Sequence, residues 1–89
     1  MSRYELTYGI TTAEDSKVLG DWLLHAAEDR AATFREDASD GQRALVADLF
    51  YIAADAFDSA AALSDGDTRA EHYANRAHWI RKRAEGIAS

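Results

Sequence analysis

Five side chains with binding chemistry recur at helical spacing in the last third of the chain. They are Arg69, His72, Arg76, Trp79 and Arg83, and steps of three and four residues would place all five on one helix face. Arginines one turn apart can contact phosphates, and an aromatic ring between them can stack on a base. The same set could dock on an acidic protein surface, with Trp79 as its anchor. This stripe is the first candidate partner-binding surface.

Other groups that could do chemistry are incomplete. His25 and Glu28 are one helical turn apart, but a carboxylate-bridged metal site in a bundle needs a second such pair on a facing helix. Asp65-Gly66-Asp67 lacks the spacing of a calcium loop and is predicted to be a turn. The chain has no cysteine, no Gly-x-Ser-x-Gly motif and no glycine-rich phosphate loop. We therefore expect no enzymatic activity, no metal and no cofactor.

The elements that must position these side chains are helices. The central one, predicted for about residues 40–63, follows a Ser39–Gln42 capping box and carries two adjacent apolar stripes. The first stripe is Leu45, Leu49, Ile52, Ala56 and Leu63, and the second is Val46, Phe50, Ala53, Phe57 and Ala60. Together they form an apolar face wider than one partner helix can cover, which predicts a central position with neighbours on two sides.

Two further helices are predicted around the central one. The first covers about residues 12–37, with Thr11 and Glu14 as a capping box. Its predicted inner face contains, in chain order, Val18, Leu19, Trp22, Leu23, Ala26, Ala27, Arg30 and Phe34. The other covers about residues 68–86, after a turn at Gly66. Because short turns make neighbouring helices antiparallel, the predicted fold is an all-α antiparallel three-helix bundle over residues 11–89.

Residues 1–10 are predicted to form a β-like extended arm. Tyr4, Leu6, Tyr8 and Ile10 alternate with polar residues, which is typical of a strand, but no second strand follows. Because a lone strand leaves backbone groups unpaired, three arrangements are open. Residues 3–10 could pair with the same segment in a homodimer, add to the sheet of another protein, or lie across the bundle. The four apolar side chains are therefore further candidate partner-binding residues.

The basic stripe has a second interpretation. In a hairpin of the last two helices about Asp65, Asp55 would lie level with Arg76, Asp48 with Arg83 and Asp58 with His72. The stripe could then pair internally with the acidic line of the central helix, or it could be solvated or bind a partner. Trp79 is predicted to cover the edge of that hairpin or to sit in an interface, whereas Trp22 is predicted to be core. Arg30 needs an acidic partner, such as Glu36 or Asp37, or else lines a polar pocket.

Charge is distributed unevenly along the chain. The formal net charge is −6, but residues 69–89 carry five basic and two acidic side chains. An acidic total argues against nucleic-acid binding through the whole surface. It leaves local binding through the last helix open, where Arg81 and Lys82 add to the stripe.

By elimination, we expect a small acidic protein–protein interaction module. It would be an adaptor, regulator or inhibitor of a larger protein, or a small assembly subunit, and a phage or mobile-element origin would suit such a chain. The alternatives are a small nucleic-acid-binding regulator that uses the Arg/Trp face of the last helix, and acidic mimicry of DNA by the first two helices. No apolar run approaches a membrane span or a signal-peptide core, and no cysteine is present, so we expect a cytoplasmic protein without membrane contact.

Overall fold

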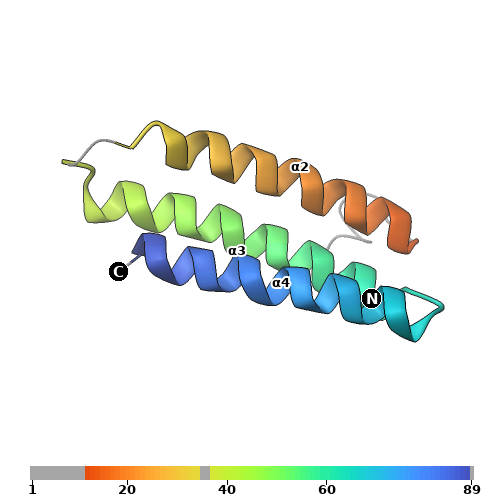
Figure 1. The fold of residues 1–89 in the computed structure, drawn as a ribbon. Helices are drawn as coiled ribbons and strands as arrows, with labels where there is room; N and C mark the ends of the chain where they lie inside the picture. The colour runs from red at the N-terminus through yellow and green to blue at the C-terminus, as the bar shows by residue number, and fades with distance from the viewer. Residues whose placement is uncertain (1–11, 35–36, 89) are drawn as a thin grey trace.

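Three α-helices account for nearly all of residues 12–34 and 37–88, the part of the chain that the computed structural model describes. They are α2 (Ala13–Ala32), α3 (Asp40–Ala62) and α4 (Asp67–Ala88), and consecutive helices run in opposite directions (Figure 1). Helix α3 packs along both neighbours, whereas α2 and α4 run parallel and share few contacts. The predicted all-α three-helix bundle with a central second helix is confirmed. The predicted arm, residues 1–10, lies outside the described residues.

Side-chain caps fix the start of the first two helices. At α3, the Ser39 hydroxyl accepts from the Gln42 amide at 3.1 Å, and the Gln42 side chain accepts from the Ser39 amide at 2.8 Å. This is the predicted capping box. At α2 the cap is Thr12, whose hydroxyl accepts from the Asp15 amide at 3.1 Å. The α2 cap therefore lies one residue later than predicted, and Thr11 is outside the described residues.

The helix ends also differ from the sequence prediction. Helix α2 ends at Ala32 rather than near residue 37, because Thr33 directs both its amide and its hydroxyl to the Arg30 carbonyl, at 3.1 and 2.7 Å. A hydroxyl that donates to a carbonyl in this way competes with the helical hydrogen bonds. Helix α4 begins at Asp67 rather than residue 68 and continues to Ala88 rather than residue 86.

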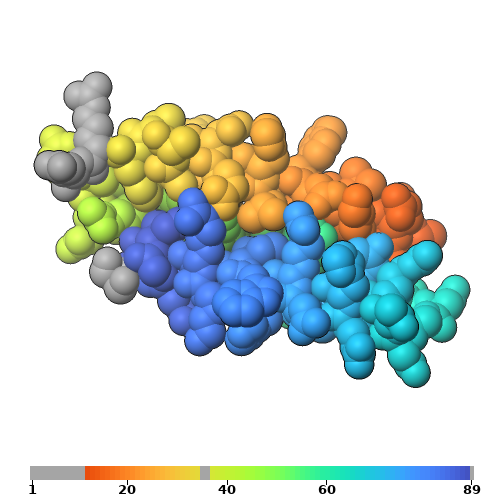
Figure 2. Space-filling view, viewed as in Figure 1, coloured from red at the N-terminus to blue at the C-terminus, as the bar shows by residue number. Residues whose placement is uncertain are grey.

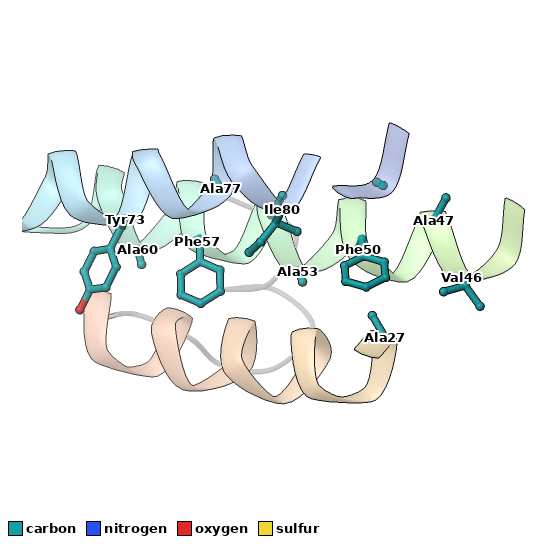
Figure 3. Close-up of a cluster of buried hydrophobic side chains, with 12 residues drawn as sticks. Ala27, Val46, Ala47, Phe50, Ala53, Phe57, Ala60, Tyr73, Ala77 and Ile80 are labelled. Carbon is teal, nitrogen blue, oxygen red and sulfur yellow. The ribbon is translucent and has the colours of Figure 1, made fainter. Parts of the chain in front are cut away.

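The core consists of the second apolar stripe of α3 together with one face of α4. Phe50 and Phe57 are fully buried and are its largest fully buried side chains (Figure 3). Around them lie Ala27, Val46, Ala47, Ala53, Ala54, Ala60, Tyr73, Ala77, Ile80 and Ala84. The rings of Phe57 and Tyr73 pack with their centroids 6.4 Å apart, which agrees with the predicted α3–α4 hairpin about Asp65.

The face that helix α2 presents to this core agrees only in part with the predicted one, since Leu23, Ala27 and Phe34 of the predicted inner face do pack on the core. Its buried residues are Ser16, Gly20 and Ala27. Trp22 is 77% exposed and Arg30 is also exposed, so the predictions of a core tryptophan and an inward arginine are wrong. The physical reason is that α3 supplies the large rings, and a Cβ on Gly20 would stand only 2.8 Å from Phe57 Cε2. In a close-packed core, small residues must face such rings.

Candidate functional site

Two arginines of the predicted basic stripe bind acids of α2. Arg76 Nη2 lies 3.8 Å from Asp21 Oδ1. Arg83 makes a two-pronged contact with Glu28, with Nε–Oε1 at 2.6 Å and Nη2–Oε2 at 2.9 Å. The prediction that Arg83 pairs with Asp48 of α3 is therefore wrong. Both ion pairs join the parallel helices α2 and α4, which share few other contacts.

These arginines also cover the core. The guanidinium carbons of Arg76 and Arg83 lie 5.2 and 5.4 Å from the ring centroids of Phe57 and Phe50. A cation is attracted to the face of an aromatic ring, and the flat guanidinium also shields that ring from water. Figure 2 shows side chains of α2 and α4 meeting over α3 on this side of the molecule. We call this region the α2–α4 seam, and it uses two members of the basic stripe to close the bundle.

The acidic line of α3 pairs with a different arginine. Arg81 donates to Asp55 at 2.9 Å and to Asp58. Long side chains on a helix lean toward its N-terminus, so Arg81 reaches α3 residues nearer the α3–α4 turn than its own level. The predicted pairs Asp55–Arg76 and Asp58–His72 are therefore wrong. The hydrogen bond with Asp58 is the main reason why the pKa of Arg81 is raised above its ordinary value.

The remaining members of the stripe are exposed. Trp79 is 69% exposed and meets the His78 ring edge-on, with centroids 5.4 Å apart. Arg69 and His72 are exposed as well. The prediction that Trp79 covers the edge of the α3–α4 hairpin is therefore wrong, whereas its place in an interface stays a prediction. The other predicted partner-binding residues, Tyr4, Leu6, Tyr8 and Ile10, lie outside the described residues.

A second candidate surface runs between α2 and α3, on the side of α3 away from α4. It is built from the first apolar stripe of α3 and from apolar side chains of α2. At one end, Leu19, Leu23 and Ile52 pack around the buried Ala56. At the other end, an open pocket of about 740 Å³ is lined by Phe34, Leu45, Leu49 and Ile52 together with polar residues. We call this pocket the α2–α3 groove, and the cluster around Ala56 is the closed part of the same helix interface, since Ala56 is fully buried.

The α2–α3 groove leaves part of the wide apolar face of α3 uncovered. Leu45 is 69% exposed, and Leu49 and Ile52 are only half-buried. On the α2 side, Trp22 is exposed and lies next to Leu23 and one turn from Leu19, at the outer edge of the cluster around Ala56. These side chains belong to the inner face predicted for α2. Hydrophobic periodicity therefore identified the apolar side chains that form this surface. It did not show that the packing of the three helices leaves part of them exposed.

Polar side chains form a rim at the pocket end of the groove. They are Arg30, Thr33, Asp37, Gln42 and Asp48. Arg30 does line a pocket, but the walls of that pocket are mainly apolar, so the prediction of a polar pocket is wrong. Arg30 makes no ion pair with any residue in 12–34 or 37–88, and Glu36, one predicted partner, lies outside these ranges. The rim thus combines a cation, two carboxylates and neutral hydrogen-bonding groups around apolar walls.

Metal and membrane chemistry find no support in the described part of the chain. Within residues 12–34 and 37–88, no three His, Cys, Asp or Glu side chains converge as metal ligands would. His25 lies 3.6 Å from Asp29, while Glu28 is engaged by Arg83. Among the same residues, no helix combines the length and the apolar character that crossing a bilayer requires.

Comparison with known protein families, curated proteins and solved structures finds no match for this chain.

Proposed function

We propose that this chain is a small protein–protein interaction module, an adaptor, regulator or inhibitor of a larger protein, whose docking face is the α2–α3 groove. The observation that supports this is the exposure of large apolar side chains on α2 and α3 in and beside one groove, with Leu45 at 69% and Trp22 at 77%. Scattered exposed apolar residues are ordinary, but a contiguous apolar patch with a polar rim is typical of a protein-binding site. Arg30 and Asp48 supply charged groups on that rim.

A binding role suits the groove better than a catalytic one. Among residues 12–34 and 37–88, the polar side chains that line its pocket include no histidine, cysteine or lysine. Nucleophilic catalysis needs a nucleophile that donates to a base, whereas the Thr33 hydroxyl at this rim donates to the Arg30 carbonyl at 2.7 Å. We also propose a cytoplasmic location, because a chain without cysteine gains nothing from an oxidising compartment.

The alternative function, nucleic-acid binding through α4, has less support. Arg76, Arg81 and Arg83 are all held by carboxylates of α2 or α3. Each would have to leave its acid to contact a phosphate, and the vacated carboxylates would repel the nucleic acid. A salt titration separates the two functions, because binding through phosphate contacts weakens steeply with salt and apolar docking does not.

The test of the proposed function compares exposed tryptophans on two faces. A photoreactive side chain at position 45 is used in cells to trap and identify a partner, whose affinity for the purified chain is then measured by calorimetry. Trp22→Ala should weaken that binding by at least about tenfold, as loss of an interface aromatic commonly does. Trp79→Ala, the matched change on α4, should leave it unaltered.

Two results would count against groove docking. An effect of Trp79→Ala equal to or larger than that of Trp22→Ala would move the docking face to α4. The absence of any specific adduct from position 45 would refute a partner in the groove.

A further inference from the structure

We propose that the α2–α3 groove is one half of a symmetric interface between two copies of this chain. In the pair, α2 of each copy lies along α3 of the other, and the two-fold axis runs parallel to the helices. Arg30 of each copy then meets Asp48 of the other, so the symmetry makes this contact twice. The inference goes beyond the proposed function, although both use the α2–α3 groove.

The surface that pairs contains the groove and the exposed strip of α2 beside it. Spacings of three and four residues place its members on one side of each helix, namely Trp22, Ala26 and Arg30 on α2 and Leu45, Asp48 and Leu49 on α3. We call these six residues the α2–α3 face. All except Leu49 are exposed. The removal of its large apolar side chains from water would drive association.

Arg30 and Asp48 stand at the same height on opposite sides of the groove. Gly20 of α2 lies beside Phe57 of α3, and the two helices run antiparallel. Counting residues from this contact places Arg30 level with Ala47, next to Asp48. Both charged side chains line the pocket, yet neither forms an ion pair with any residue in 12–34 or 37–88. The face therefore presents opposite charges at one height to whatever covers it.

The direction of the two-fold axis decides which charges meet. An axis parallel to the helices keeps each residue at its own height and exchanges α2 with α3, so Arg30 faces Asp48 of the second copy. An axis across the helices at this height would instead place α3 on α3 and bring Asp48 close to Asp48. Like charges in contact oppose association. The parallel axis also makes all neighbouring helices antiparallel, as in an up-and-down four-helix bundle.

The apolar members of the face find matching positions in the same arrangement. By the count from Gly20, Ala26 of the second copy falls level with residue 51, close to Leu49, so a small side chain meets a large one. Trp22 of the second copy falls level with residue 55 and lies against α3 instead of in water. Leu45 falls level with residue 32 and is covered by the last turn of α2.

The α2–α3 face is large enough for a weak pair. Helix α2 has 20 residues, so at about 1.5 Å per residue the face is about 30 Å long. Two helices of about 10 Å diameter make it about 20 Å wide, and pairing covers on the order of 600 Å² of each copy. Stable complexes cover about 800 Å² per partner, so we expect a dissociation constant of about 10–100 µM. At about 5 µM, as in a stability measurement, the chain is then mainly monomeric.

Charge reversal tests the pair, with the mass in solution measured by analytical ultracentrifugation. Arg30→Glu or Asp48→Arg alone places like charges in both contacts and should weaken self-association at least about tenfold. The double variant Arg30→Glu/Asp48→Arg exchanges the two charges and should restore the dimer to within about threefold of the parent. Arg69→Glu, the same charge change on α4, should leave self-association unaltered.

A mixture of the two single variants supplies a second check. One variant carries two acids at positions 30 and 48 and the other carries two arginines, so both contacts between unlike copies pair opposite charges. The mixture should therefore form a dimer that neither variant forms alone. Each reversal changes the net charge of −6 by two, to −8 or −4, so overall attraction between the variants cannot produce this result. Rescue in the mixture also shows that both single variants fold.

Trp22 reports whether the α2–α3 face is the one that pairs. Trp79→Phe leaves Trp22 as the only tryptophan of the chain. Its emission should move to shorter wavelength as the protein concentration passes through the dissociation constant, because the indole ring leaves water. A dimer that forms without this shift would overturn the proposal, since another face would then be paired.

Three results of the ultracentrifugation would also overturn the proposal. They are a parent chain that stays monomeric at about 1 mM, a dimer that the single reversals leave intact, and a double variant as monomeric as the single ones. All these measurements use the pure protein, so their failure does not touch the partner-trapping result. A dimer in solution, with a second copy as the only adduct trapped at position 45, would refute the proposed function alone.

Discussion

Replacing Gly20 by alanine tests directly how α2 packs on the core. The added Cβ would stand 2.8 Å from Cε2, 2.9 Å from Cδ2 and 3.1 Å from Cζ of Phe57. Carbon atoms attract each other best at about 3.5–4.0 Å, so the two groups must separate by roughly 0.7 Å or more. The Phe57 ring is fully buried and lies under the Arg76 guanidinium, so it has no free space to enter. Helix α2 must therefore move outward.

Two effects of opposite sign determine the change in stability. Alanine favours a helix over glycine by about 1 kcal/mol. Overpacking a tight core costs about 1–3 kcal/mol, and three short contacts with one ring place this case near the upper figure. We therefore expect Gly20→Ala to lower the free energy of unfolding by about 2 kcal/mol. At about 4–8 °C per kcal/mol for a domain of this size, the melting temperature should fall by about 8–16 °C.

Urea denaturation followed by far-UV circular dichroism measures this loss. Gly86→Ala on α4 is the matched control, because its new Cβ would meet nothing within 4 Å, and it should be neutral or stabilising by up to about 1 kcal/mol. Phe57→Leu should cost less in the Gly20→Ala background than in the parent, because both changes act on one contact. A Gly20→Ala protein as stable as the parent would refute the close packing of α2 on Phe57.

Three further predictions concern the free energy of unfolding, measured in the same way. Phe50→Ala should cost about 3–5 kcal/mol because it empties the buried core, whereas Leu45→Ala at its exposed site should change stability by less than about 0.5 kcal/mol. Similar losses would contradict the assignment of one α3 stripe to the core and the other to the groove. Arg83→Met should cost about 1 kcal/mol because the bond to α2 and the cover over Phe50 are lost, while Lys82→Met, which breaks only a surface pair within α4, should be neutral. Equal effects of these two would argue that the seam does not stabilise the bundle. Ser16→Ala should raise stability by about 0.5–1 kcal/mol, because the Ser16 hydroxyl is buried without a hydrogen-bond partner among the described residues. A clear loss would reveal a partner for that hydroxyl.

The fold class could be predicted because the signals for it are local and agree with each other. Two apolar stripes on one segment require neighbours on two sides, and the Ser39–Gln42 box marks where that segment begins. The inner face of α2 could not be predicted in the same way. A prediction from hydrophobic periodicity depends on large apolar side chains such as Trp22. The contact with Phe57, however, is made by Gly20, which has no side chain at all. Shape complementarity between two helices is not a property of either sequence alone.

The ion pairs show a second limit of sequence reasoning. Arg76 and Arg83 are seven residues apart, and so are their partners Asp21 and Glu28 on α2. That match was present in the sequence, but two acids of α3, at positions 48 and 55, have the same spacing. Charge spacing alone therefore cannot choose between the two neighbouring helices. The choice is made by packing, because the arginines lie over the rings that α2 and α4 enclose.

The regular spacing of charges at the α2–α4 seam bears on how uniquely α2 is placed. If α2 slid by seven residues along α4, Glu28 would come opposite Arg76 and an acid would again face an arginine. The electrostatic energy of the seam is thus nearly degenerate between such alignments. The core is not, because the same slide would bring the Cβ of Ala27 to the place where Phe57 admits only Gly20. The missing Cβ of Gly20 therefore distinguishes between alignments that the charges alone would not. Helix α2 takes a single alignment instead of several equivalent ones.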